Sequence, residues 1–220
     1  MKLLRAAVSI LFVLGPLWAQ ADNLGPDAGA CSAAALPLQQ RWDDITYQLA
    51  EADREAAYVD LIQQTSAATA ALPQCAAVWI WDGITRSTYA GAAGGLGALK
   101  SIRHAKRSLQ QAIAIDATAL SGAAHTSLGS LYYQAPGWPI SFGDKKLAEQ
   151  HLRLALDMAP NDIDANYFYG DYLFTRKQYP QAQLALHKAL AAAPRPERPV
   201  ADLGRRAEIQ RLLDQIARKL

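Results

Sequence analysis

The sequence is poor in the residues that most often build metal and redox sites. Its 220 residues include two cysteines, two methionines and four histidines. The cysteines form no close couple, and no two of the histidines, His104, His125, His151 and His187, have metal-ligand spacing within one helix. We therefore expect no metal site and no cofactor.

The chain also lacks an excess of charge of one sign. Lys and Arg number 22 and Asp and Glu 20, which gives a formal charge of +2. Lys2 and Arg5 account for that excess, and both lie in a leader that we expect to be removed, so the remaining chain is about neutral. Nucleic acid is not an expected partner, because such binding depends on clustered Lys and Arg that neutralise phosphates.

The apolar stretch near the start is too short to span a bilayer. It runs from Ala6 to Trp18 and is broken by Gly15-Pro16, which makes it about 13 residues where a spanning helix needs about 20. Basic residues precede it and Ala19-Gln20-Ala21 follows it, the layout of a secretory signal peptide. We expect residues 1–21 to be cleaved and residues 22–220 to be exported without stable membrane insertion; a retained membrane anchor is the alternative.

The two cysteines, Cys31 and Cys75, both remain after cleavage. In an oxidising compartment they are expected to pair, and a bridge of this span would stabilise the fold by roughly 4 kcal/mol. Two buried free thiols are the alternative. Lipidation of Cys31 is a third reading, disfavoured because the polar segment 22–27 separates it from the apolar stretch.

A repeat of 34 residues is the strongest pattern in the sequence. Ala148, Leu152, Ala155, Leu156 and Pro160 recur, 34 positions later, as Ala182, Leu186, Ala189, Leu190 and Pro194. Small Ala and large Leu on one helical stripe permit close packing of a neighbouring helix, and Pro ends the helix. The pattern predicts stacked helical hairpins.

The helix before each of these carries a glycine, Gly129 in one unit and Gly170 in the next, followed by a tyrosine. With this second half, the sequence resembles the tetratricopeptide repeat (TPR) family, whose first helix carries Leu-Gly and Tyr and whose second carries Ala, a large apolar residue, Ala and Pro. The resemblance implies an all-α solenoid of antiparallel helical hairpins. Two turns within hairpins are expected to be enlarged, those at 91–97 and 135–144.

A single solenoid domain is therefore expected over residues 22–220. Its predicted units are a degenerate one at about 36–75, then 76–121, 122–162 and 163–196, with a capping helix at about 200–220. In the unit beginning at 76, Asp82 and Arg86 stand where the family prefers apolar residues. The capping helix is predicted to have one apolar face, with Arg205 and other basic residues elsewhere. The residues of the apolar face are Leu203, Ile209, Leu212, Leu213, Ile216 and Leu220.

A narrower resemblance rests on the leader, a Trp-rich unit, the Gly-rich turn, the segments 131–136 and 143–148, and Pro160-Asn161-Asp162. Over roughly residues 75–195 the chain is similar to the periplasmic T-component proteins associated with tripartite ATP-independent periplasmic (TRAP) transporters. That likeness implies a Gram-negative periplasmic location and a protein partner, either a solute-binding protein or a transporter subunit. Self-association is left open.

Motifs for catalysis are missing from the sequence. Lys100-Ser101 follows a run of glycines, but Ala98-Leu99 intervenes where a phosphate loop needs Gly directly before Lys. Helix packing explains Ser127-Leu128-Gly129-Ser130 better than a nucleophile elbow does. Asp162 and Asp164 are explained as residues that start a helix. We expect no catalytic residues and no enzyme activity.

Binding is the remaining class of function. In the TPR arrangement the first helices line a concave groove, which suits an extended peptide or a partner helix. The candidates in or beside this groove, any of which could instead pack against the next hairpin, are Trp79, Ile80, Ile84, Ser87, Thr126, Ser130, Tyr133, Asp164, Tyr167, Asp171 and Phe174.

Trp138, between Pro136 and Pro139, is a further candidate. It either covers the core beneath the enlarged turn, the reading we favour, or presents an apolar anchor to a partner. An alternative function is a small-molecule or lipid carrier, with a pocket between the Trp-rich unit and this turn.

Overall fold

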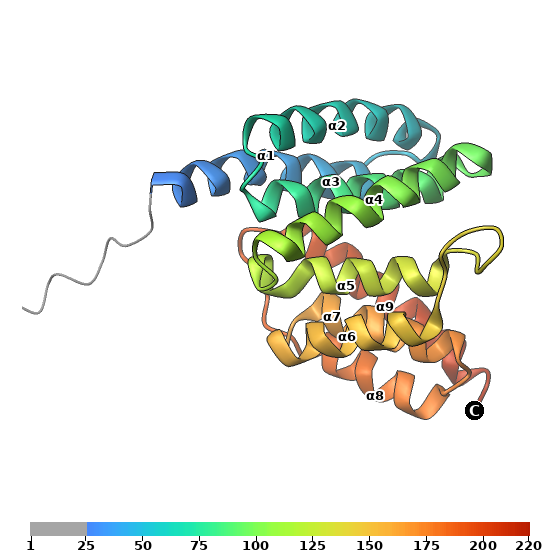
Figure 1. Ribbon diagram of the computed structural model, residues 1–220. Coiled ribbons are helices and arrows are strands. Elements are labelled where there is room, and N and C mark those ends of the chain that lie inside the picture. The colour runs from blue at the N-terminus through green and yellow to red at the C-terminus, as the bar shows by residue number, and fades with distance from the viewer. Residues whose placement is uncertain (1–25) are drawn as a thin grey trace, which may run out of the picture.

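The computed structural model describes residues 26–220, so the predicted leader lies outside the described residues. Within that range the chain forms nine α-helices and no strand, which confirms the all-α class (Figure 1). The helices are α1 (Pro26–Tyr47), α2 (Glu51–Ala71), α3 (Ala76–Ala93), α4 (Gly95–Ile115), α5 (Ala119–Gln134), α6 (Lys145–Met158), α7 (Ile163–Thr175), α8 (Tyr179–Leu190) and α9 (Pro199–Ala217).

Three of the hairpins share one helix crossing. A Cβ added at Gly83, Gly129 or Gly170 would lie 2.5, 2.7 or 2.8 Å from the Cγ of a leucine on the following helix. Those leucines are Leu109, Leu152 and Leu186, each fully buried. Glycine is therefore required where α3 crosses α4, α5 crosses α6 and α7 crosses α8, since no side chain fits between the backbones.

The Gly-rich segment at 91–97 is not the enlarged turn that the sequence predicts. Helix α3 continues to Ala93 and α4 begins at Gly95. The chain reverses at Gly94 and Gly95, whose φ angles of 64° and 63° lie in the left-handed region that favours glycine. The additional residues instead lengthen both helices.

A loop does join α5 to α6 over residues 135–144. Asp144 N–H donates to the Tyr132 carbonyl at 2.8 Å, and Gly143 N–H to that of Pro136 at 2.9 Å. The Asp144 side chain then caps α6 by accepting from the backbone N–H groups of Lys146 and Leu147. Both ends of the loop are thus fixed by hydrogen bonds.

The disulfide between Cys31 and Cys75 is present, as the sequence predicts, with the two Cα atoms 5.4 Å apart. It ties the first part of α1 to the N-cap of α3. Around it lies an N-terminal core that includes Trp42, Tyr58 and Trp81. The bridge therefore joins α1 to the hairpin of α3 and α4.

Asp82 and Arg86, the two exceptions to the apolar pattern, form a buried polar network. Arg86 pairs with Asp82 at 2.8 Å. Thr65 of α2 and Ser108 of α4 donate to the same carboxylate at 2.7 and 2.6 Å. Because Asp82 is only 3% exposed, these bonds supply the partners that burial requires. The network joins three helices where an apolar side chain would join only two.

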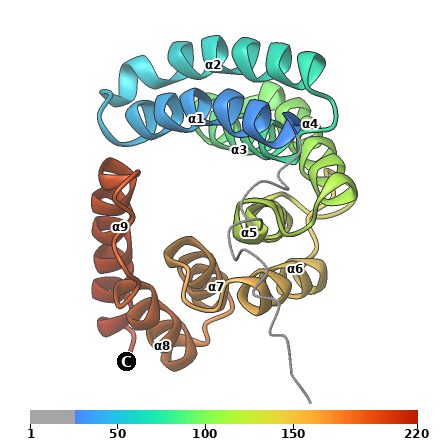
Figure 2. The same cartoon turned by 90° about the vertical axis from the view of Figure 1, so that its left-hand side faces the viewer.

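The helices curve into a ring (Figure 2). Helices α2, α4, α6 and α8 lie outside, α3, α5 and α7 inside, and α9 runs from α8 back to α1, which it contacts. In the prediction α9 only covers the open end of the last unit. The ring closes because α9 packs against the first hairpin as well as the last.

The buried face of α9 also differs from the predicted one. Leu203 and Leu220 are 75% and 69% exposed, whereas Arg205 is 7% exposed. Arg205 is buried because it points into the ring, where acidic partners neutralise it. Among residues 26–220, no helix combines the length and apolar character needed to cross a bilayer.

Candidate ligand-binding cavity

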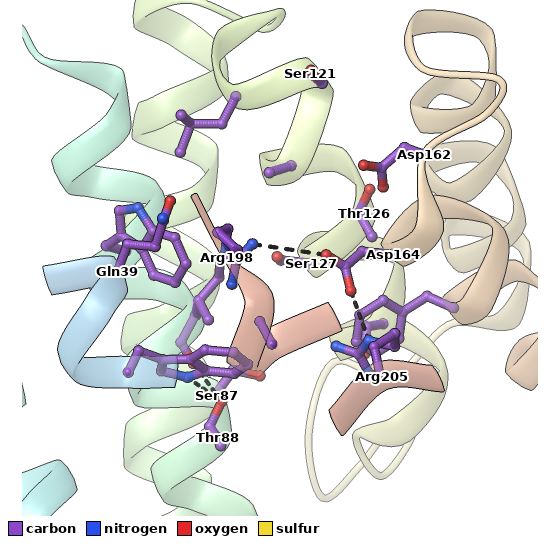
Figure 3. A pocket seen from close by; sticks show the side chains of 18 of the residues that line it. Gln39, Ser87, Thr88, Ser121, Thr126, Ser127, Asp162, Asp164, Arg198 and Arg205 are labelled. Carbon is purple, nitrogen blue, oxygen red and sulfur yellow. Dashed lines mark hydrogen bonds and ion pairs between the residues drawn. The ribbon is translucent and has the colours of Figure 1, made fainter. Parts of the chain in front are cut away.

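A cavity of about 160 Å³ lies inside the ring (Figure 3). Helices α1, α3, α5, α7 and α9 all contribute to its lining. Its residues are Gln39, Trp42 and Tyr47 from α1; Trp81, Ile84, Ser87 and Thr88 from α3; Leu120, Ser121, Ala123, Thr126, Ser127 and Ser130 from α5; Asp162, Asp164 and Phe168 from the start of α7; and Arg195, Arg198, Ala201 and Arg205 from α9 and the segment before it.

One wall of the cavity is aromatic. The rings of Trp42 and Trp81 lie 5.9 Å apart, and Trp42 Nε1 donates to Thr88 Oγ1 at 3.1 Å. Six small hydroxyl side chains line the α3 and α5 sides. The two indole planes are tilted by 49°, and such aromatic faces beside hydroxyl groups can bind a compact organic molecule by stacking and hydrogen bonding.

The opposite wall is an ion cluster centred on Asp164. Arg195 Nη1 and Arg205 Nε donate to its two carboxylate oxygens at 2.8 and 2.6 Å, and Arg198 Nη1 lies 3.9 Å away. Burial disfavours the charged carboxylate, but the charges of Arg205, Arg195 and Arg198 outweigh this, so the pKa of Asp164 lies well below its usual range. Asp164 therefore stays ionised.

The arginines are held by further contacts. Arg195 Nε donates to Asp202 at 2.7 Å. Arg205 also pairs with Glu208, and its guanidinium lies 4.3 Å from the ring centre of Tyr167. Since each arginine has an acidic partner, the wall has fixed geometry and little net charge of either sign.

Arg198 closes the ring. Its Nη2 and Nε donate to the carboxylate of Asp43, in α1, at 2.6 and 3.1 Å, across a sequence separation of 155 residues. Its guanidinium lies 5.3 Å from the ring centre of Trp81. Burial raises the pKa of Asp43, and Arg198 opposes that shift. The same arginine thus joins the ends of the ring and lines the cavity.

The α5 side of the cavity begins with an unusual backbone turn. Leu120, Ser121 and Gly122 have φ angles of 49°, 58° and 75°. Left-handed residues other than glycine cost roughly 1–2 kcal/mol each. Leu120 and Ser121 both line the cavity, so this turn places strained backbone at the candidate site, a common feature of functional sites.

Five of the predicted groove residues line this cavity: Ile84, Ser87, Thr126, Ser130 and Asp164. Tyr167 and Asp171 line an adjoining cleft of about 600 Å³, which shares Ser87 and Ser130 with the cavity and also contains Arg54 and Glu208. Tyr133 donates to Asp171 at 2.5 Å, across neighbouring inner helices. Seven of the predicted groove residues therefore line one or both of two adjoining hollows.

Four predicted groove residues line neither hollow, Tyr133 among them. Ile80 is fully buried in the core. Trp79 donates from Nε1 to the Pro73 carbonyl at 3.0 Å, and Phe174 packs on Tyr179 with ring centres 5.6 Å apart. These contacts are the packing role that the sequence left open.

Trp138 does not cover the core, contrary to the reading that the sequence favours. Its side chain is 90% exposed, and neighbouring Ile140 is 59% exposed. Between the Trp-rich unit and this loop lies a shallow groove, bounded by α4 and residues 139–142, whereas the cavity lies on the inner side of the ring. The 135–144 loop therefore extends outward, away from the cavity.

Sequence reasoning missed the aromatic pair and the arginines. Trp42 belongs to the unit judged degenerate, and Arg195 and Arg198 occupy the Pro-rich segment before the last helix. The available signal was a pair of arginines among three prolines at 194–199, followed by Arg205 in α9. That all three arginines line the same cavity depends on ring closure, which the repeat does not encode.

Comparison with known proteins finds no family model and no curated sequence that matches the chain. Over residues 26–220, no three His, Cys, Asp or Glu side chains gather as a metal site would require.

Proposed function

We propose that the chain is a non-catalytic binding protein, a TPR-like solenoid closed into a ring around a small ligand. The observation that carries this proposal is the cavity lined by α1, α3, α5, α7 and α9. The glycine and leucine crossing shared by three hairpins supports the TPR-like arrangement. Closure by α9 favours the carrier function over a groove that holds an extended peptide.

The cavity favours a compact, uncharged ligand with a flat apolar body and several hydrogen-bonding groups. Stacking would use Trp42 and Trp81, and the hydroxyls of α3 and α5 would bond the polar groups. A strongly charged ligand is disfavoured, since Arg195, Arg198 and Arg205 already have acidic partners.

Native mass spectrometry of protein purified from its own compartment tests the proposal. We expect the wild-type chain to retain a small organic ligand whose volume matches the cavity of about 160 Å³, and Ser127→Phe, which fills the cavity from α5, to lose it. Gln150→Phe, on the exposed face of α6, is the matched control and should retain it. A wild-type chain without ligand, or a Ser127→Phe chain that keeps it, contradicts the proposal.

Export to the periplasm forms part of the proposal. It is supported by the predicted leader and by the disulfide, which suits an oxidising compartment. Ligand capture there would suit an accessory to solute uptake, as the resemblance to TRAP-associated proteins implies.

A protein-interaction scaffold is the second candidate. The 600 Å³ cleft favours it, because the cleft contains predicted groove residues and charges of both signs, including Arg54, Asp171 and Glu208. The partner would be a solute-binding protein or a transporter subunit. Mild cross-linking in the native host should capture it, and Arg54→Ala should weaken that capture while Ser127→Phe leaves it intact.

A further inference from the structure

The loop between α5 and α6 exposes large apolar side chains without a partner in the ring. Trp138 is 90% exposed and Ile140 59%. Figure 1 shows this loop, between α5 and α6, standing clear of the helices. Isolated apolar residues are common on surfaces, but a tryptophan exposed to this extent is not, because it is among the most buried side chains on average.

The surroundings of the loop are basic. Helix α4, which supports it, contains no acidic residue and carries Lys100, Arg103, Lys106 and Arg107. Arg103 Nη2 donates to the Ile140 carbonyl at 3.3 Å, and Lys106 Nζ lies 4.7 Å from the ring centre of Phe142. Arg103 thus lies directly beside exposed Ile140, and Lys106 lies beside the half-buried Phe142 of the same loop.

The far end of the loop continues this charge. Lys145 and Lys146 follow it and are exposed, and the one acid beside them, Asp144, is engaged as the helix cap. A shallow groove between α4 and the loop is lined by Arg103, Lys106 and Arg107 together with Pro139, Ile140 and Phe142. Cations from two helices thus flank one apolar tip.

We propose that this loop docks the ring on an anionic phospholipid surface. Trp138 and Ile140 enter the interfacial region, where tryptophan is enriched because one end of its ring is apolar and the other polar. The lysines and arginines of α4 and α6 contact the lipid phosphates, to which such residues are attracted within a Debye length. A membrane supplies both the phosphate plane and the apolar layer that this arrangement of side chains fits. The site is separate from the cavity and does not rest on its function.

Co-sedimentation with lipid vesicles tests this proposal. We use the processed chain with a mass-verified N-terminus, the same in every variant. Binding is expected to vesicles of phosphatidylcholine that contain phosphatidylglycerol, and to be much weaker on phosphatidylcholine alone. Trp138→Ala should lower partitioning by about tenfold. Each of Arg103→Gln and Arg107→Gln should lower it by about fivefold, with a steeper salt dependence in the wild type than in the variants.

Matched controls separate docking from general stickiness. Leu184→Ser and Leu203→Ser remove apolar side chains that are 72% and 75% exposed at other places, and both should bind as the wild type does. Circular dichroism should show unchanged helix content for Trp138→Ala, since the side chain contacts no core. The membrane proposal is wrong if the wild type does not bind anionic vesicles, or if the Leu variants lose as much binding as Trp138→Ala. In that case an acidic protein becomes the expected partner of the loop.

Discussion

At the scale of single residues, the contact between His125 and His151 has the clearest consequence. Their Nδ1 atoms lie 2.9 Å apart, so one ring donates and the other accepts. Burial lowers the pKa of both histidines, and repulsion from His125 adds to the effect on His151, whose pKa falls to about 4. The folded pair is therefore neutral at a pH where unfolded histidines begin to bind protons.

Stability should consequently depend on pH between about 6.5 and 4. A base with a lowered pKa contributes its stability above the unfolded pKa and loses it as the pH falls towards the folded value, by at most about 1.4 kcal/mol per pH unit for each histidine. We expect the urea midpoint of the wild type to fall over this interval, and the midpoint of the double variant His125→Gln, His151→Gln to fall less. His187→Gln, at an exposed position, is the control, and a double variant as steep as wild type would disprove the role of the pair.

At the scale of helices, a glycine at the shared crossing and a glycine away from it should respond differently to substitution by alanine. A Cβ at Gly129 would lie 2.7 Å from Leu152 Cγ and 3.2 Å from the Ala148 carbonyl oxygen, whereas none lies within 4 Å at Gly97 of α4. Gly129→Ala should lower the free energy of unfolding by about 1–3 kcal/mol. Gly97→Ala should leave it unchanged or raise it by up to about 1 kcal/mol. Thermal melts of the two variants decide this, and equal shifts would contradict the crossing.

Helices and their pairing are the part of the fold that the sequence predicts best. The Ala and Leu stripes and the helix-ending prolines act locally, which is why the all-α class is confirmed. The turn at 91–97 was wrongly predicted because its glycines and alanines are compatible with helix once both helices can pack along their added length. The prediction for Trp138 is wrong for a related reason. Its neighbours in the sequence predict a turn, but they do not determine whether the Trp138 side chain points towards the core or towards solvent.

At the scale of the whole molecule, ring closure involves a close approach of α9 to α1 beside the contact between Arg198 and Asp43. A Cβ at Gly204 would overlap the Tyr47 ring. Gly204→Leu should therefore separate α9 from α1, enlarge the radius of gyration in small-angle scattering and release any retained ligand, while helix content stays the same. Adding Tyr47→Ala should restore closure because it vacates the space. A compact Gly204→Leu ring with ligand still bound would refute this account of the closure.

The cavity was only half predictable because the closure is global. Repeat register placed Ser87, Thr126, Ser130 and Asp164 on the inner side. The residues that complete the cavity, Arg198 above all, reach it across 155 residues of sequence through a contact that no periodicity announces.

The contact between Arg198 and Asp43 also fixes how many hairpins the molecule can have. An open solenoid gains or loses a unit easily, because each touches only its neighbours. Here an inserted hairpin would carry α9 past α1, and a deleted one would leave it short. Repeat arrays ordinarily grow by duplication of a unit. In this ring, a change in the number of hairpins would break the contact between Arg198 and Asp43 and open the cavity.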